Sequence, residues 1–212
     1  MSRPIGLLGG TFDPIHVGHL RVALELLEGL ALERVAFVPC REPPHRGPPR
    51  RSGEFRLDLV RAAVAAEPRF CVDERELERE GPSYTIDTLA DIRREEPARP
   101  LCLLLGMDAF LGLPSWHRWA ELLDYAHIVV AHRPGWIPPR DGVLGELLAR
   151  RRTAASDDLR TQAHGCLLVT PVTQLEISST ELRRALAAGR DPRYLVPDSV
   201  RERLLASAAY RR

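Results

Sequence analysis

Two histidines stand three residues apart in the segment GGTFDPIHVGHL, residues 9–20. His16 and His19 follow two adjacent glycines, and an amphipathic segment begins near Gly18 after a short apolar run at residues 5–8. The pattern predicts a strand, a tight turn and a helix. Adjacent glycines let the backbone approach a ligand closely, a helix start offers unpaired N–H groups to an anion, and residues three apart face one side. The segment therefore predicts a bound phosphate group with two imidazoles beside it.

A second group of polar side chains stands near the end of the sequence. Ser178, Ser179 and Thr180 precede a helix that we expect over residues 181–188. Ser178 and Glu181 fit the S/T-x-x-E capping box, and capping alone would explain these residues. Three hydroxyls at a helix start, with an Arg-Arg pair one turn further on, would also make a second anion site.

Residues 40–52, CREPPHRGPPRRS, contain four prolines and several cationic or imidazole side chains, without any periodicity. This composition is typical of a solvated, proline-rich linker or of a ligand for a polyproline-binding module, and composition alone favours that interpretation. The alternative is a basic lid, in which His45 and Arg46 close over phosphate groups.

The elements that position these residues alternate between strand and helix. Apolar and β-branched runs predict strands at residues 34–38, 70–72, 101–105, 126–131 and 167–169, and helical periodicity predicts helices at 54–66, 84–92, 114–123 and 143–152. We expect Ser83 to cap the second helix, residues 73–81 to be a solvated connection, and residues 153–164 to have no assignable pattern. The result is an α/β fold, one domain over residues 1–212 with a doubly wound, mainly parallel sheet and helices on both faces.

The run LCLLL at residues 101–105 has no polar alternation, as expected for a central parallel strand covered on both faces. Ligands of open α/β sheets bind beyond the carboxyl ends of the strands. Asp108 follows this strand closely and is placed for a ribose hydroxyl, although an aspartate there is equally a routine helix cap. Trp116 and Trp119 stand three apart, which core packing would also explain.

The composition limits the class of protein. The 212 residues carry a formal net charge of +1, which argues against a polyanion-binding surface and hence against nucleic acid as the main partner. The four cysteines are scattered without a CxxC pair and are expected to be buried thiols in a reducing compartment. No segment approaches the ~20 apolar residues of a membrane span. We therefore expect a cytoplasmic protein with no membrane contact.

Taken together, these residues closely resemble the bacterial nicotinate-nucleotide adenylyltransferases. These belong to a nucleotidylyltransferase superfamily with an HxGH signature and a serine-rich helix start, here HVGH at residues 16–19 and ISSTELR at residues 177–183. Further matches are PPHR at 43–46, SYT at 83–85, GMD at 106–108, WHRW at 116–119, RPG at 133–135 and YLVP at 194–197. The family usually has Lys where this chain has Arg46, so a planar fork replaces a mobile point charge.

The resemblance implies a Rossmann-like core, ATP and nicotinic acid mononucleotide as substrates, and Mg²⁺ as the cofactor that accompanies ATP. No residue of this chain is assigned as a metal ligand, since no carboxylate cluster is obvious. The catalytic residues that it implies are His16, His19, Arg46 and Arg183. The ATP-binding residues would be Gly9, Gly10, Thr11, Phe12, His16, His19, Gly106, Asp108, Ile177, Ser178, Ser179, Thr180 and Arg183. The mononucleotide-binding residues would be His45, Arg46, Tyr84, Thr85, Trp116 and Arg133.

For the second substrate, Tyr84 and Thr85 at a helix start can present backbone amides to the nicotinate carboxylate, and Trp116 can stack on the pyridinium ring. Two other functions stay open. One is another HxGH-type nucleotidylyltransferase, and the other is a non-catalytic pyridine-nucleotide sensor on the same fold. The sequence leaves the oligomeric state open, a homo-oligomer included.

Overall fold

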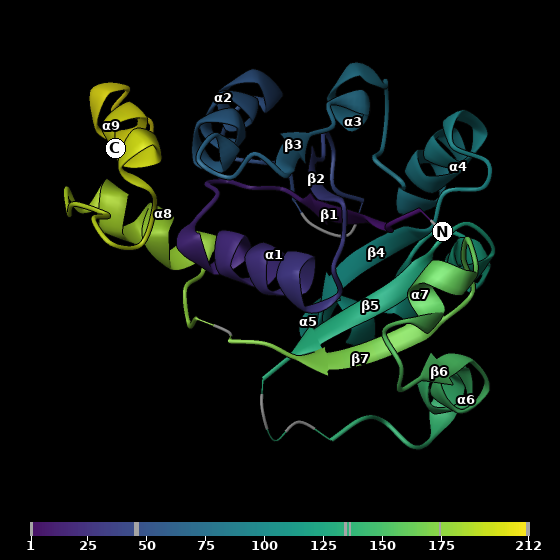
Figure 1. Ribbon diagram of the computed structural model, residues 1–212. Helices are drawn as coiled ribbons and strands as arrows, with labels where there is room; N and C mark the ends of the chain where they lie inside the picture. The colour runs from purple at the N-terminus through teal and green to yellow at the C-terminus, as the bar shows by residue number, and fades with distance from the viewer. Residues whose placement is uncertain (1, 45–46, 134, 136, 174, 211–212) are drawn as a thin grey trace.

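Seven parallel strands form one sheet in the part of the chain that the computed structural model describes, residues 2–44, 47–133, 135, 137–173 and 175–210 (Figure 1). Their order across the sheet is β3-β2-β1-β4-β5-β7-β6. The strands are β1 (Ile5–Gly10), β2 (Arg34–Pro39), β3 (Phe70–Val72), β4 (Leu101–Gly106), β5 (His127–His132), β6 (Arg152–Thr153) and β7 (Leu167–Pro171). This confirms the expected doubly wound α/β architecture.

Helices cover both faces of the sheet, because side chains alternate between the faces along each strand. On β4, Cys102 and Leu104 join one buried cluster, whereas Leu101, Leu103 and Leu105 join the other. The first cluster is covered by α1 (Val17–Gly29), α2 (Gly53–Val64), α7 (Asp158–Thr161), α8 (Ser179–Ala187) and α9 (Asp198–Ala206). The second is covered by α4 (Thr85–Glu95), α5 (Met107–Leu111), η1 (Leu113–Ser115), η2 (Trp119–Asp124) and α6 (Gly142–Arg151).

The strand order reverses between β1 and β4, and the two strands separate there. Their pairing ends at Leu7 opposite Leu103, whereas β1 stays paired with β2 as far as Gly10 opposite Pro39. Such a switch point opens a crevice beyond the carboxyl ends of the strands, which is where α/β sheets bind ligands. The residues that follow β1 and β4 are therefore the expected place for a ligand.

The structure differs from the sequence-based expectations in three places. The helix expected at residues 114–123 is two short 3₁₀ helices, because Arg118 adopts a left-handed conformation with φ of 51°. The connection at residues 73–81 contains a helical turn, α3 (Arg75–Glu78), in which Glu76 is buried. Residues 153–164, left without assignment, contain the end of β6 and helix α7.

Ser83 does not cap α4 as predicted, since Tyr84 is the N-cap residue. The Ser83 hydroxyl instead accepts hydrogen bonds from the backbone N–H groups of Arg41 and Glu42, at 2.9 and 3.3 Å. A long-range contact has taken the hydroxyl that a local cap would use. Ser83 thus joins the start of the 40–52 loop to the start of α4.

The four cysteines are free thiols, as predicted, although Cys71 is only half-buried. No helix among the described residues is long and apolar enough to cross a membrane.

Candidate active site

The turn after β1 is built closely around its two glycines. Gly9 is exposed although β1 lies in the middle of the sheet, and a Cβ at this position would meet nothing within 4 Å. A Cβ at Gly10 would lie 2.8 Å from the ring of Phe12, which is buried and has φ of 47°. Gly10 is therefore needed for packing, whereas Gly9 borders open space in the crevice.

His16 and His19 lie side by side at the start of α1. Their ring centroids are 3.7 Å apart with an interplanar angle of 30°. The backbone N–H of His16 donates to Nδ1 of His19 at 3.3 Å, which leaves the proton of a neutral His19 on Nε2. A Cβ at Gly18 would lie 3.0 Å from Nδ1 of His16, so the glycine of HVGH makes room for this ring.

Both imidazoles are neutral at physiological pH. Burial lowers the pKa of His16 to about 4. Burial and then the adjacent His16 lower the pKa of His19 to about 3. Nδ1 of His16 is buried and has no hydrogen-bond partner among the described residues. The site thus presents neutral imidazoles, each of which has one N–H group that can donate to an incoming phosphate group.

Helix α8 brings the second predicted group to the first. Oγ of Ser179 donates to the carbonyl of Pro14 at 2.9 Å. Arg183 donates from Nη1 to the carbonyl of Asp13 at 2.7 Å and from Nη2 to Oγ1 of Thr180 at 3.0 Å. Figure 1 shows α8 beside the N-terminal end of α1. The ISSTELR and HVGH segments, distant in sequence, therefore form one site.

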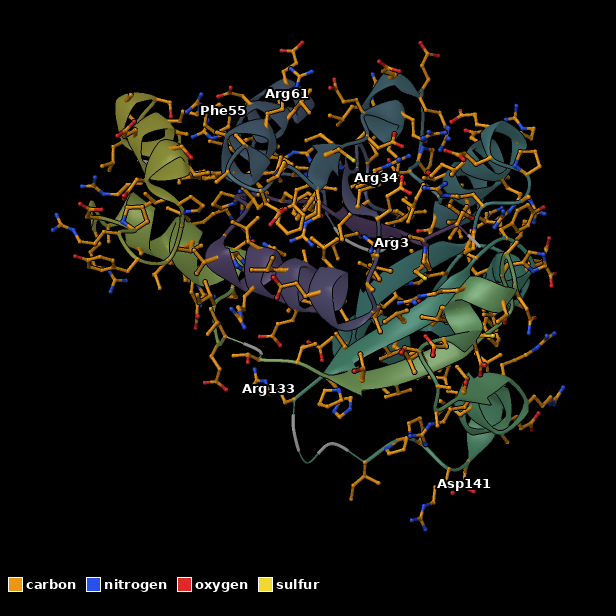
Figure 2. The ribbon with its side chains drawn as sticks, in the orientation of Figure 1. Arg3, Arg34, Phe55, Arg61, Arg133 and Asp141 are labelled. Carbon is orange, nitrogen blue, oxygen red and sulfur yellow. The ribbon has the colours of Figure 1, made fainter. Side chains whose placement is uncertain are left out.

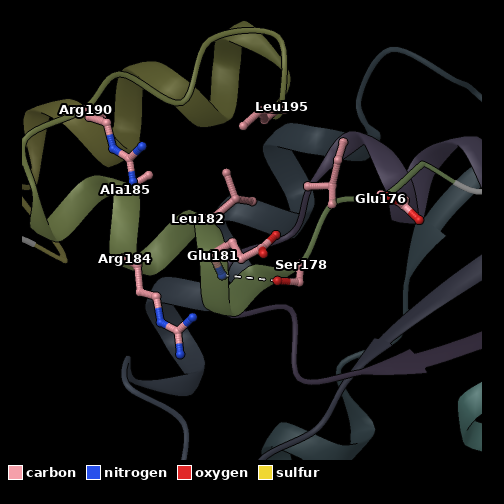
Figure 3. Close-up of a pocket in the computed structure, with 9 residues that line it drawn as sticks. Glu176, Ser178, Glu181, Leu182, Arg184, Ala185, Arg190 and Leu195 are labelled. Carbon is pink, nitrogen blue, oxygen red and sulfur yellow. Dashed lines mark hydrogen bonds between the residues drawn. The ribbon is translucent and has the colours of Figure 1, made fainter.

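Ser178 is the N-cap of α8 and its Oγ accepts a hydrogen bond from the Glu181 N–H at 3.2 Å, as the capping motif predicts. Ser178 and Ile177 line a pocket of about 340 Å³. Figure 3 shows the Ser178–Glu181 hydrogen bond at the wall of this pocket. Arg184 and Arg190 line the same pocket. Ile177 and Ser178 thus border a cavity on the outer side of α8, while Ser179 and Arg183 contact the turn after β1.

Gly106 and Asp108 lie at the carboxyl end of β4 and in the first turn of α5. Gly106 is the N-cap of α5, and a Cβ there would meet nothing within 4 Å. Asp108 is exposed in the first turn of α5 and does not cap it. The open space beside Gly9 and the open space beside Gly106 therefore lie at the ends of the two strands that separate.

Three of the six predicted mononucleotide residues, Tyr84, Thr85 and Trp116, lie at the start of α4 and the end of η1. No side chain caps α4, so the first-turn amides beginning with Thr85 have no side-chain acceptor. The ring of Tyr84 stacks on His117, with centroids 4.3 Å apart and an interplanar angle of 32°. Trp116 is half-buried and packs against the same core cluster as Tyr84. His117 was not predicted, although its place in WHRW beside Trp116 was a usable signal.

Arg133 follows β5 and forms an ion pair with Glu176, in the segment between β7 and α8 (Figure 2). The structure thus places Arg133 beside the α8 entry. Two further predicted residues, His45 and Arg46, lie outside the described residues.

Arg56 of α2 holds the turn after β1 through a buried side chain, and no sequence motif indicated this residue. Its side chain is 1% exposed and donates to the carbonyls of Thr11, Arg51 and Arg41, at 2.7, 3.2 and 3.5 Å. Arg56 therefore ties the turn after β1 to both ends of the 40–52 loop. The available signal was an arginine one turn before Leu59 on the apolar face of the predicted helix.

No group of three or more His, Cys, Asp or Glu side chains suited to a metal ion occurs among the residues whose positions are described. Neutral imidazole donors, backbone amides and arginines, arranged around open space, suit charge stabilisation of a phosphate ester rather than covalent catalysis by a protein nucleophile.

Residues 7–185 match the protein family model described as cytidylyltransferase-like. The chain is 53% identical over 211 residues to a probable nicotinate-nucleotide adenylyltransferase of Aeromonas hydrophila, covering 100% of this chain and 99% of that protein. It is 51% identical to one of the same description from Halorhodospira halophila, covering 98% and 95%.

Solved structures share the fold at low sequence identity. The nicotinic acid mononucleotide adenylyltransferase of Plasmodium falciparum, complexed with NaAD, superposes with a TM-score of 0.73 at 16% identity, covering 98% of this chain and 97% of that one. A putative nicotinate-nucleotide adenylyltransferase from Vibrio parahaemolyticus gives a TM-score of 0.65 at 18% identity, covering 99% and 96%.

Proposed function

The chain belongs to the nicotinate-nucleotide adenylyltransferase family, and from this premise we propose that it transfers the adenylyl group of ATP to nicotinic acid mononucleotide. The products are nicotinic acid adenine dinucleotide and pyrophosphate, a step of NAD biosynthesis. The observation that carries the proposal is the joining of two distant motifs. Arg183 and Ser179 of α8 donate hydrogen bonds to the carbonyls of Asp13 and Pro14. These two residues lie in the loop just before the paired histidines, which follows β1 at the switch point of the sheet.

The ATP half of the site is proposed to lie between the turn after β1 and α8. Gly9 to Phe12 would present backbone to the phosphates, and His16 and His19 would donate N–H groups to them. Arg183 donates to the carbonyl of Asp13 and to the hydroxyl of Thr180 in the first turn of α8. Part of its guanidinium would turn to the β- and γ-phosphates. Gly106 and Asp108 would contact the adenosine, Asp108 through the ribose.

The chemistry needs little from protein nucleophiles. The phosphate of the mononucleotide attacks the α-phosphorus of ATP in line, a new P–O bond forms, and the bond to the bridging oxygen of pyrophosphate breaks. Catalysis then rests on positioning and on donors that strengthen as charge moves onto that bridging oxygen. Neutral His16 and His19 suit this task because they gain attraction as the oxygen becomes more negative.

The mononucleotide half is proposed to lie at α4 and η1. The uncapped start of α4 favours the nicotinate carboxylate, which a helix N-terminus attracts more strongly than a neutral carboxamide. Trp116 would stack on the pyridinium ring. Access requires the Tyr84–His117 stack to accommodate that ring, and Arg46 with His45 would close from the 40–52 loop.

Mg²⁺ is proposed to enter bound to the triphosphate of ATP rather than to a preformed protein site. Elements from both ends of the chain pack on one sheet, which supports a single domain over residues 1–212.

A substrate panel tests the proposal. The protein is assayed for pyrophosphate release from ATP with nicotinic acid mononucleotide, nicotinamide mononucleotide, phosphopantetheine and no acceptor. We expect release with the two pyridine nucleotides, the acid form having the higher kcat/KM by roughly tenfold. Turnover with phosphopantetheine instead would indicate another HxGH-type transferase, and tight binding without turnover would indicate a sensor.

A further inference from the structure

The side chain of Tyr210 reaches the turn after β1 from the far end of the chain. Its hydroxyl donates to Oδ1 of Asp13 at 2.5 Å, and the two residues are 197 positions apart. The guanidinium of Arg51 lies 5.1 Å from the centre of the Tyr210 ring. Burial and then the Asp13 hydrogen bond raise the pKa of the phenol above its usual range, so the phenol stays protonated and donates.

Asp13 connects three separate segments. Its side chain is 4% exposed, and Oδ2 accepts the backbone N–H of Arg50 at 2.7 Å, at the end of the 40–52 loop. Its backbone carbonyl accepts Nη1 of Arg183, and the guanidinium of that arginine lies 3.9 Å from Oδ2. A change in the position of Asp13 is therefore passed directly to the loop and to an arginine of the proposed ATP half-site.

The hydrogen bond from Tyr210 is needed for this arrangement. A buried carboxylate must be satisfied by donors, and losing one is costly. Among the described residues, the Tyr210 hydroxyl is the hydrogen-bond donor to Oδ1 of Asp13. Without it, the carboxylate would turn toward Arg183 or toward solvent, and the Asp13–Pro14 segment would shift with it.

We propose that Tyr210 is a positioning residue for the ATP half of the site, acting through Asp13 to hold Arg183 and the turn after β1 in place. The proposal rests on the function proposed above only for the identity of the ligand, ATP. It assigns to the end of the chain a role in nucleotide binding that neither segment's local sequence indicates.

The test is Tyr210→Phe, which removes the hydroxyl and keeps the ring under Arg51. We expect the Kd and KM for ATP to rise roughly tenfold, the range for a hydrogen bond to a charged group. The KM for the mononucleotide should rise less than that for ATP, because Tyr210 packs on the face of the sheet opposite α4 and Asp13 reaches the proposed mononucleotide residues only through the 40–52 loop, at Arg50. The matched control is Tyr194→Phe, an exposed tyrosine (87%) of the same C-terminal region, which should behave as wild type.

A double variant separates positioning from general stability. If Tyr210 acts through Arg183, Tyr210→Phe should add little to Arg183→Ala in ATP affinity, whereas independent effects would add. Folding of each variant is checked by circular dichroism at the assay temperature and by measurement of Tm. If Tyr210→Phe does not fold, Asp13→Asn replaces it. The amide has an NH2 group in place of one carboxylate oxygen, so only one of the Tyr210 and Arg50 donors keeps its acceptor, and a loss of ATP affinity is again expected.

Unchanged ATP affinity in Tyr210→Phe would overturn the inference, as would equal losses for both substrates. Since ATP affinity is measured by calorimetry, this result does not depend on turnover. Wild-type protein that binds ATP without releasing pyrophosphate would contradict the proposed function and leave the comparison of affinities intact.

Discussion

Arg183 of α8 donates to the backbone carbonyl of Asp13 at 2.7 Å across a separation of 170 residues. This hydrogen bond joins the serine-rich helix start to the loop that leads into the paired histidines. Ser179 reinforces it through the carbonyl of Pro14. The proposed ATP half-site is therefore assembled by tertiary contacts between two segments far apart in the sequence.

Gly9→Ala tests whether the open space at the end of β1 belongs to the ligand. A Cβ there meets no protein atom within 4 Å, so the fold should tolerate it and Tm should stay unchanged. The KM for ATP should rise roughly tenfold or more, since an extra methyl in a close contact typically costs about 1–3 kcal/mol. Gly29→Ala, with equally open surroundings at the end of α1, is the control. Unaltered kinetics in Gly9→Ala would show that ATP does not approach this backbone.

His19→Ala tests stabilisation of the transition state. Its Nε2–H is the free donor, because Nδ1 accepts from the His16 N–H. We expect kcat to fall by ~10²-fold or more, as for the removal of a donor aimed at developing charge. His164→Ala, an exposed histidine at the amino end of β7, should keep the wild-type rate. A His19→Ala enzyme with normal kcat would remove His19 from the mechanism.

The two lowered histidine pKa values predict how stability depends on pH. In the folded state the pKa of His16 is about 4 and that of His19 about 3, whereas both pKa values are 6.5 in the unfolded chain. Between pH 6.5 and these lowered values the unfolded chain therefore binds more protons than the folded one. The free energy of unfolding should therefore have its full value above pH 6.5 and should fall as the pH is lowered toward 4. Urea titrations of wild type and of His16→Gln/His19→Gln at pH 7.0 and 5.0 measure this. Equal losses in both proteins would argue against neutral, desolvated imidazoles.

Arg56→Met tests the buried tie between the turn after β1 and the 40–52 loop. The variant keeps most of the stem but leaves three carbonyls without their donor, so the free energy of unfolding should fall by about 2–4 kcal/mol. Arg61→Met on the same helix removes one exposed ion pair with Glu74 and should cost less than about 1 kcal/mol. If both variants lowered the free energy of unfolding by the same amount, the three buried hydrogen bonds of Arg56 would add no more to stability than one exposed ion pair.

The sequence was sufficient wherever the signal was local. The apolar run LCLLL predicted β4, and Ser178 with Glu181 predicted the start of α8, because strand burial and capping depend on neighbouring residues. The prediction failed where a distant contact decided the outcome. Ser83 was expected to cap α4 but bonds to Arg41 and Glu42.

The same reason explains the missing parts of the site. Arg56 and Tyr210 belong to no recognisable motif, and the contacts of Asp13 do not follow from its place in GGTFDPIHVGHL, because the partners of these residues lie up to 197 residues away. The prediction of a helix at 114–123 was wrong for a different reason. Arg118 adopts a left-handed conformation, and no glycine or asparagine at this position indicates a break in the helix. The site residues themselves stay predictions, because their roles were inferred from the family resemblance.

Label transfer tests the central claim most directly. The protein is incubated with nicotinic acid mononucleotide, Mg²⁺ and ATP labelled either at the α- or at the γ-phosphorus. Transfer of the adenylyl group predicts that the α-label appears in a dinucleotide and the γ-label in pyrophosphate, in equal amounts. A γ-label in the mononucleotide product, or both labels retained in ATP that is bound but not consumed, would contradict it.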